Sequence, residues 1–201
     1  MRTLVASRIL VAVLMPMLSG CGGRNVVKGD ADYPQENPTP RHLVTISGVV
    51  PPELDISFKG AWQATANESC SYVVGASAPI YYSMRTDLEF SRSGDRFTLP
   101  VPTDKYISGR CNWTLSLIEL IVSRNNGYPS KVGIQLNHAR TSAKKMDVWC
   151  TKSKSTGGNE KDWGMCLNFK LGVRQQPPAP TSLSISEYDL SPAELNIHYE
   201  E

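Results

Sequence analysis

The sequence has few of the groups on which most enzyme mechanisms depend. Only three of its 201 residues are histidine, and none of them has a second histidine or a carboxylate at the spacing of a known catalytic or metal motif: His42, His138 and His198. No Gly-x-Ser-x-Gly, His-Glu-x-x-His or phosphate-binding glycine loop occurs. We therefore expect no enzymatic activity, no cofactor, no metal and no small-molecule substrate. A glycosidase, which uses a pair of carboxylates, is the weakest alternative. The candidates Asp87 and Glu89 alternate with apolar residues, and a solvated strand face explains that pattern better.

A strong charge of one sign is also lacking. The 21 lysines and arginines nearly balance the 19 acidic residues, for a formal net charge of +2. The only charged residues among the first twenty are Arg2 and Arg8, so removal of that segment would lower the net charge from +2 to 0. A neutral chain lacks the positive charge that binds nucleic-acid phosphates, and we expect no nucleic-acid partner.

The chain has no apolar run long enough to cross a bilayer. The longest run, from Ile9 to Leu18, is broken by Pro16 and is about half of the roughly 20 residues that a transmembrane helix needs. Arg2 and Arg8 precede it, and the small residues Ser19 and Gly20 follow it. This order is typical of a secretory signal peptide, which we assign to residues 1–20.

An odd cysteine stands directly after the signal peptide. The order Leu18-Ser19-Gly20-Cys21 resembles the lipobox of bacterial lipoproteins. In that family the cysteine thiol receives a diacylglyceryl group, the chain is cut before it, and the new amino terminus is acylated. The resemblance implies that Cys21 is a lipid anchor, since two or more acyl chains hold a protein stably at a membrane. Gly22 stands where an aspartate commonly retains such proteins at the inner membrane, which implies the periplasmic face of the outer membrane.

The other four cysteines form an even set, as expected of a disulfide framework in an exported protein: Cys70, Cys111, Cys150 and Cys166. Four cysteines allow three connectivities. Pairing the cysteines consecutively along the chain, first with second and third with fourth, favours Cys70–Cys111 and Cys150–Cys166. A zinc site is the less favoured alternative, because structural zinc sites prefer cysteines only a few residues apart.

The rest of the chain divides into a polar tether and one domain. Residues 21–41 contain three prolines and no apolar periodicity, which predicts a flexible tether. Residues 42–201, which we call the head, contain short runs with period two, at 54–59, 87–90, 96–101, 132–136, 166–173 and 195–199. Glycine, proline, asparagine and aspartate separate these runs. The pattern predicts an all-β antiparallel sandwich, of the immunoglobulin or transthyretin kind, fastened by two disulfides.

Two features of the head have alternative interpretations. The segment WTLSLIELIVS has apolar spacing that would fit a short helix, but its β-branched residues favour a central strand with a bulge near Ile118. The four tryptophans are expected to pack in the core near the disulfides rather than to form a binding platform: Trp62, Trp113, Trp149 and Trp163.

Two polar segments are candidate contacts for a protein partner. The loop between Cys150 and Cys166 would be pinned at its ends by a disulfide and offers Lys152, Lys154, Lys161 and Trp163. The segment TDKY offers Asp104, Lys105 and Tyr106. A plain hairpin loop explains the first segment equally well, and Trp163 could instead pack on the disulfide.

The middle of the chain resembles a group of small periplasmic lipoproteins. The segments APIYYSMRTDLEF and GDRFTLPVPTDKYISGRCNWTL, followed by two further cysteines and a final strand, carry the resemblance. Some of these lipoproteins are immunity proteins that protect a cell from lipase effectors of type VI secretion. The resemblance implies an anchored inhibitor of a secreted lipase toxin. The alternative is a structural lipoprotein of the envelope or of the type VI apparatus.

Substituting Cys21→Ser removes the thiol that would carry the lipid. We expect this variant to move from the membrane fraction to the soluble periplasmic fraction, because the head itself has no second anchoring segment. Cell fractionation followed by immunoblotting measures the change. Retention of the variant in the membrane contradicts the lipobox interpretation.

Overall fold

Two six-stranded β-sheets enclose one hydrophobic core in the computed structural model, which describes residues 25–65, 68–73, 79–125, 127, 129–136, 142–153, 163–167, 182–183 and 191–200. The first sheet, called the β14 sheet, has the order β12 (Trp163–Leu167), β11 (Lys145–Ser153), β14 (Ala193–Glu200), β1 (Leu43–Val49), β7 (Arg96–Pro102) and β6 (Ser91–Ser93). The second, the β8 sheet, has the order β10 (Ser142–Ala143), β13 (Ser182–Leu183), β9 (Ser130–Leu136), β8 (Trp113–Ser123), β2 (Asp55–Ala64) and β5 (Ser83–Leu88). The predicted all-β sandwich is confirmed.

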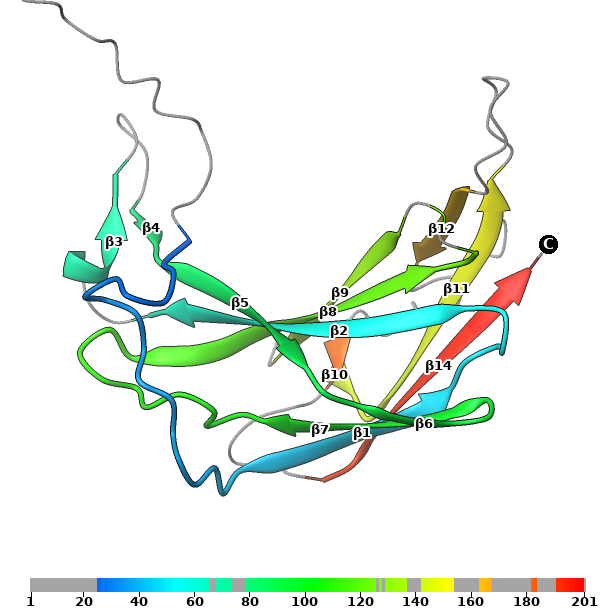
Figure 1. Ribbon diagram of the computed structural model, residues 1–201, viewed down its shortest axis with the longest axis horizontal. Coiled ribbons are helices and arrows are strands. Elements are labelled where there is room, and N and C mark those ends of the chain that lie inside the picture. Colours follow the sequence, from blue (N-terminus) through cyan, green and yellow to red (C-terminus); the bar gives the residue numbers. More distant parts are fainter. Residues whose placement is uncertain are drawn as a thin grey trace, which may run out of the picture.

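A short hairpin lies outside the two sheets, at one end of the sandwich (Figure 1). It consists of β3 (Ser71–Tyr72) and β4 (Ile80–Tyr81), and the 3-10 turn η1 (Glu68–Cys70) precedes it. Among the described residues, no helix has the length and apolar character needed to span a membrane.

Alternating side chains of the strands build the core, as the period-two pattern predicts. In β7 the apolar residues Phe97, Leu99 and Val101 are buried while their neighbours point to solvent. The same alternation buries Ile56 and Phe58 in β2. The predicted run at 166–173 lies within the described residues only as far as Leu167, the end of β12.

The segment WTLSLIELIVS forms a strand, β8, as predicted in preference to a helix. Its register with β2 shifts between Ala61 and Trp62, which lie opposite Leu117 and Leu115. Ser116 is the extra residue of this bulge, and its hydroxyl donates to the Ala61 carbonyl at 3.1 Å. The bulge therefore falls two residues before the predicted position at Ile118.

Two strands, β14 and β13, depart from the antiparallel pairing of the other strands. Strand β14 lies between β11 and β1 and runs parallel to both, and β13 runs parallel to β9 and β10. Strands that follow each other through a tight turn must be antiparallel, but β13 and β14 belong to different sheets, so no hairpin sets the direction of β14.

Close approach of the backbones accompanies the insertion of β14. Leu195 and Ile197 point into the core and are fully buried or nearly so. On the side of β1, a Cβ atom added to Gly48 would overlap the Leu195 carbonyl group. Glycine at position 48 thus permits β1 to pass beside β14 at this separation.

The prediction of a flexible tether over residues 21–41 is wrong from Asn25 onward. Val26 is only 4% exposed, and its N–H donates to the Ser83 carbonyl at 3.1 Å. Further along, the Asn37 N–H donates to the Lys105 carbonyl at 2.8 Å. This segment has no periodicity because it is held by single backbone contacts and isolated apolar side chains rather than by a continuous strand. The head therefore includes residues 25–41, and Cys21 lies outside the described residues.

Truncating Leu195→Ala should destabilise the protein by about 2–5 kcal/mol, because the side chain is fully buried in the strand that joins β11 to β1. The matched control is Leu43→Ala, which removes the same atoms from a side chain that is 50% exposed; surface changes of this kind usually stay within about 0.5 kcal/mol. Urea denaturation followed by tryptophan fluorescence measures both. Equal losses in the two variants would contradict this role of β14.

Candidate functional site

The segment TDKY, a candidate partner contact, is used inside the protein. The Asp104 carboxylate accepts the backbone N–H of Arg41 at 2.9 Å and that of His42 at 3.1 Å. The Asn37 amide donates to the Asp104 backbone carbonyl at 2.9 Å. Burial raises the pKa of Asp104, but the hydrogen bonds from the Arg41 and His42 N–H groups outweigh burial and hold that pKa below its ordinary value. Asp104 therefore fastens the N-terminal segment to the head.

Tyr106 belongs to the core rather than to a surface. It is 4% exposed, and its ring packs edge-on against Trp62 at 5.1 Å between centroids and against Tyr33 at 6.4 Å. Burial raises its pKa to about 12, so the phenol stays neutral. The Lys105 ammonium lies 5.8 Å from the Tyr106 ring centroid. The burial of Tyr106 corrects its assignment to partner contact. Asp104 and Lys105 are half-buried, and their contact with a partner stays a prediction.

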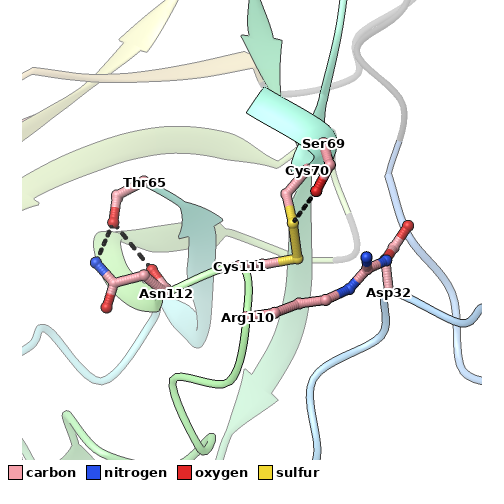
Figure 2. The surroundings of a disulfide bond; sticks show 7 residues. All are labelled: Asp32, Thr65, Ser69, Cys70, Arg110, Cys111 and Asn112. Atoms are coloured by element: carbon pink, nitrogen blue, oxygen red, sulfur yellow. Dashed lines mark hydrogen bonds and ion pairs between the residues drawn. A yellow bond between two sulfur atoms is a disulfide. The ribbon is translucent and has the colours of Figure 1, made fainter. Parts of the chain in front are cut away.

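The first disulfide joins Cys70 to Cys111, as predicted, with 5.6 Å between their Cα atoms. Figure 2 shows Arg110 beside this bond, directed at Asp32 of the N-terminal segment, with which it forms an ion pair. On the other side, the Asn112 amide donates to the Thr65 hydroxyl at 2.7 Å. The disulfide thus joins η1, which precedes the β3–β4 hairpin, to the segment before β8, at the end of the molecule where the N-terminal segment enters.

The same place holds the possible metal ligands Asp32, Cys70 and Cys111, whose ligand atoms lie within 4.8 Å of one another. The two sulfur atoms are bonded to each other, so neither is a free thiolate. In this oxidised state the cluster does not have the ligand set of the zinc alternative.

The second disulfide joins Cys150 to Cys166 and is also as predicted. The two cysteines lie directly opposite each other in β11 and β12. Farther along this strand pair, Lys152 lies opposite Gly164, and Trp163 lies opposite Ser153. The disulfide thereby brings the backbone at Lys152 and Trp163 to one strand pair. The other two predicted contacts, Lys154 and Lys161, lie outside the described residues.

Trp149 lies on the outer face of the β14 sheet, which corrects the prediction that it packs in the core. Its neighbours Val148 and Cys150 point inward, so Trp149 points outward and is half-buried. Its ring stacks on the imidazole of His198 in the adjacent strand, with 4.1 Å between centroids and 15° between planes. Trp62 and Trp113, by contrast, are buried in the core as predicted.

A carboxylate holds the imidazole in place. His198 Nε2 lies 3.0 Å from Asp147 Oδ1, across the β11–β14 pair. At the other end of the β11–β14 pair, Lys145 Nζ lies 3.2 Å from Glu194 Oε1. The hydrogen bond from Asn196 and the ion pair with Lys145 lower the pKa of Glu194. Sequence analysis missed the His198–Asp147 pair because the two residues are 51 positions apart, and only the parallel pairing of β11 with β14 brings them together.

Apolar side chains of β12 continue this face. Leu167 lies opposite Trp149, and Met165, which is 45% exposed, lies opposite Thr151. Cys166 points inward between them, so both point outward. We call this set the outer patch: Asp147, Trp149, Met165, Leu167 and His198. The sequence contains one signal for the outer patch. A disulfide-bonded Cys150 faces the core, and alternation along a strand then makes its neighbour Trp149 face outward.

The arrangement suits recognition of another protein. A tryptophan at the centre, apolar residues on one side and paired charges at the margin are the features of a protein interface with a few dominant contacts. Strands fix the backbone at all five residues, so little backbone freedom remains to be lost on binding.

Comparisons with known proteins gave no match to a family model, to a curated protein or to a solved structure. The geometry of the fold and of the outer patch therefore carries the functional argument.

Substituting Asp104→Ala should loosen the N-terminal segment without unfolding the sandwich. Two backbone N–H groups lose their charged acceptor, so we expect amide exchange at Arg41 and His42 to accelerate about tenfold near pH 7. Hydrogen exchange followed by NMR or mass spectrometry measures this, with the amides of β8 as the internal control.

The same contact predicts a pH dependence. Because the pKa of Asp104 is lowered in the folded protein, its stabilising effect is complete above the ordinary value of 3.8 and is lost as the pH falls through the lower folded value. Acidification should therefore accelerate amide exchange at Arg41 and His42 in the native protein and change it less at the same amides of Asp104→Ala. An identical acid response in both proteins would exclude Asp104 as the fastening group.

Proposed function

We propose that this protein is a lipid-anchored periplasmic protein that binds a protein partner through the outer patch and neutralises it by occupying its working surface. The observation that carries the proposal is the position of Trp149 on the outer face of the sheet, stacked on His198 and beside Met165 and Leu167. Tryptophan is among the residues that most often dominate the binding energy of protein interfaces.

The rigidity of the patch supports inhibition by stoichiometric binding. Trp149 lies next to Cys150, and Leu167 lies next to Cys166, so the disulfide fixes the strand pair that carries them. On the other side, β14 holds His198 and lies between two neighbouring strands. A preorganised surface binds more tightly than a mobile one of equal area, because less entropy is lost.

The resemblance to immunity proteins supports a toxin as the partner. A secreted lipase in the periplasm attacks membrane lipids, and an inhibitor anchored in that membrane would be positioned to bind the lipase there. Acylation of Cys21 would confine the inhibitor to that surface and raise its local concentration there. Gene neighbourhood selects the partner for a test: an adjacent gene for a periplasmic lipase supports immunity, whereas adjacent genes of the type VI apparatus support the structural lipoprotein.

Substituting Trp149→Ala should weaken the complex with that lipase by about thirtyfold or more, the effect of losing a dominant contact of about 2 kcal/mol. Isothermal titration calorimetry with the purified proteins measures the affinity, and a lipase assay measures inhibition. The control variant is Thr98→Ala, an exposed position in β7 of the same sheet. Unchanged binding by Trp149→Ala would remove the outer patch from the interface.

Three further outcomes separate the alternatives. The triple alanine variant at Lys152, Lys154 and Lys161 tests the end of the β11–β12 pair; a loss of binding there with Trp149→Ala unaffected would move the interface from the patch to the lysines. A complex that leaves lipase activity intact contradicts neutralisation. The absence of any complex with the lipase favours the structural lipoprotein.

A further inference from the structure

Exposed apolar side chains gather at one end of the sandwich. The described chain has six exposed large apolar side chains, and four of them lie at the end where the N-terminal segment enters: Val27, Val73, Ile80 and Ile107. Val27 follows the bridge between Asn25 and Ser83, and Ser83 is the first residue of β5, the strand that comes after the β3–β4 hairpin. The hairpin carries Ile80 in β4, and Val73 directly follows β3.

Backbone contacts place Ile107 and the hairpin at this end as well. The Ile107 N–H donates to the Gln35 carbonyl at 2.9 Å, within the N-terminal segment. The Tyr82 N–H donates to the Cys70 carbonyl at 2.9 Å, beside the disulfide to Cys111. Figure 1 shows the β3–β4 hairpin on the left and β12 with the end of β14 on the right. The outer patch and this apolar end therefore lie toward opposite ends of the molecule.

Tyrosines accompany the exposed apolar residues. Tyr72, Tyr81 and Tyr82 are all half-buried, and Tyr72 lies opposite Ile80 in the hairpin. The rings of Tyr72 and Tyr82 stack with 6.4 Å between centroids. Tyrosine has an apolar ring and a polar hydroxyl, and it is enriched where a protein meets the headgroup region of a bilayer.

The length of chain before Asn25 limits how far this end can lie from the anchor. Cys21 precedes Asn25 by four residues, which reach at most about 14 Å when fully extended. Asn25 is fixed beside Ser83, and Val26 is buried, so residues 25–41 cannot serve as a spacer. Acyl chains on Cys21 would thus hold this end of the head at the lipid surface.

We propose that the membrane-facing end, formed by Val27, Val73, Ile80 and Ile107 with Tyr72, Tyr81 and Tyr82, rests on the phospholipid bilayer with its apolar side chains at the boundary of headgroups and acyl chains. This inference rests on the acylation of Cys21 that is part of the proposed function. The contact orients the head, because acyl chains alone fix distance but not direction. It directs the outer patch away from the bilayer, where a partner can reach it.

The test places a reporter at each end of the full-length lipidated protein. Ile80→Trp and Met165→Trp each replace one exposed apolar side chain by an indole, the first at the membrane-facing end and the second in the outer patch. Each variant is reconstituted into vesicles of phosphatidylethanolamine and phosphatidylglycerol, with and without lipids that carry a nitroxide at the headgroup. We expect nitroxide lipids to quench the added fluorescence of Ile80→Trp at least threefold more than that of Met165→Trp.

Val73→Trp is the second variant for the same end, in case tryptophan at position 80 disturbs the hairpin, and circular dichroism verifies the fold of each. Equal quenching at both ends, or stronger quenching at Met165, overturns the membrane contact. The membrane contact is also overturned if the indole of Ile80→Trp becomes shielded from its surroundings only when the lipase is added, since this end would then be a protein interface. Mass spectrometry of the same sample reports acylation: an unmodified Cys21 contradicts the anchor itself, whereas equal quenching with an acylated Cys21 contradicts only the orientation.

Discussion

The insertion of β14 between β1 and β11 is the contact on which the architecture depends. Without it the first sheet would separate into the pair β12–β11 and the group β1–β7–β6, and the core would lose Leu195 and Ile197. The last described strand therefore pairs with the first strand in the middle of this sheet and connects its two halves. The same strand supplies His198, on which Trp149 stacks, so the constraint that completes the fold also builds the centre of the outer patch.

A second constraint acts at the other end, where residues 25–41 lie on the sandwich instead of leaving it. Asp104 fastens the backbone at Arg41 and His42, and Val26 is buried beside Ser83. The consequence is geometric: a lipid on Cys21 would sit close to the head, and the head would have a preferred orientation on the bilayer. In the proposed function the two ends of the molecule have different roles, attachment at the β3–β4 hairpin and recognition at the β11–β14 pair.

Patterns among neighbouring residues predict the structural features that depend only on short stretches of the chain. Alternation in segments such as that of Phe97, Leu99 and Val101 identified strands and their buried faces, and sequence proximity identified both disulfides. Patterns could not predict the direction of β14 or the pairing of His198 with Asp147, because both depend on a connection between sheets. The sequence predicts a tether at residues 25–41 because isolated contacts such as that of Val26 leave no periodicity.

The central claim is that the outer patch is the recognition surface of an anchored inhibitor. Hydrogen exchange of the full-length lipidated protein in vesicles, with and without the neighbouring lipase, tests it most directly, since it reports every strand at once. The account predicts slower exchange on addition of the lipase in β11, β12 and β14, with no change in β2, β5 and β8. Slower exchange confined to the β8 sheet or to the β3–β4 hairpin, or no change in any strand, would contradict it.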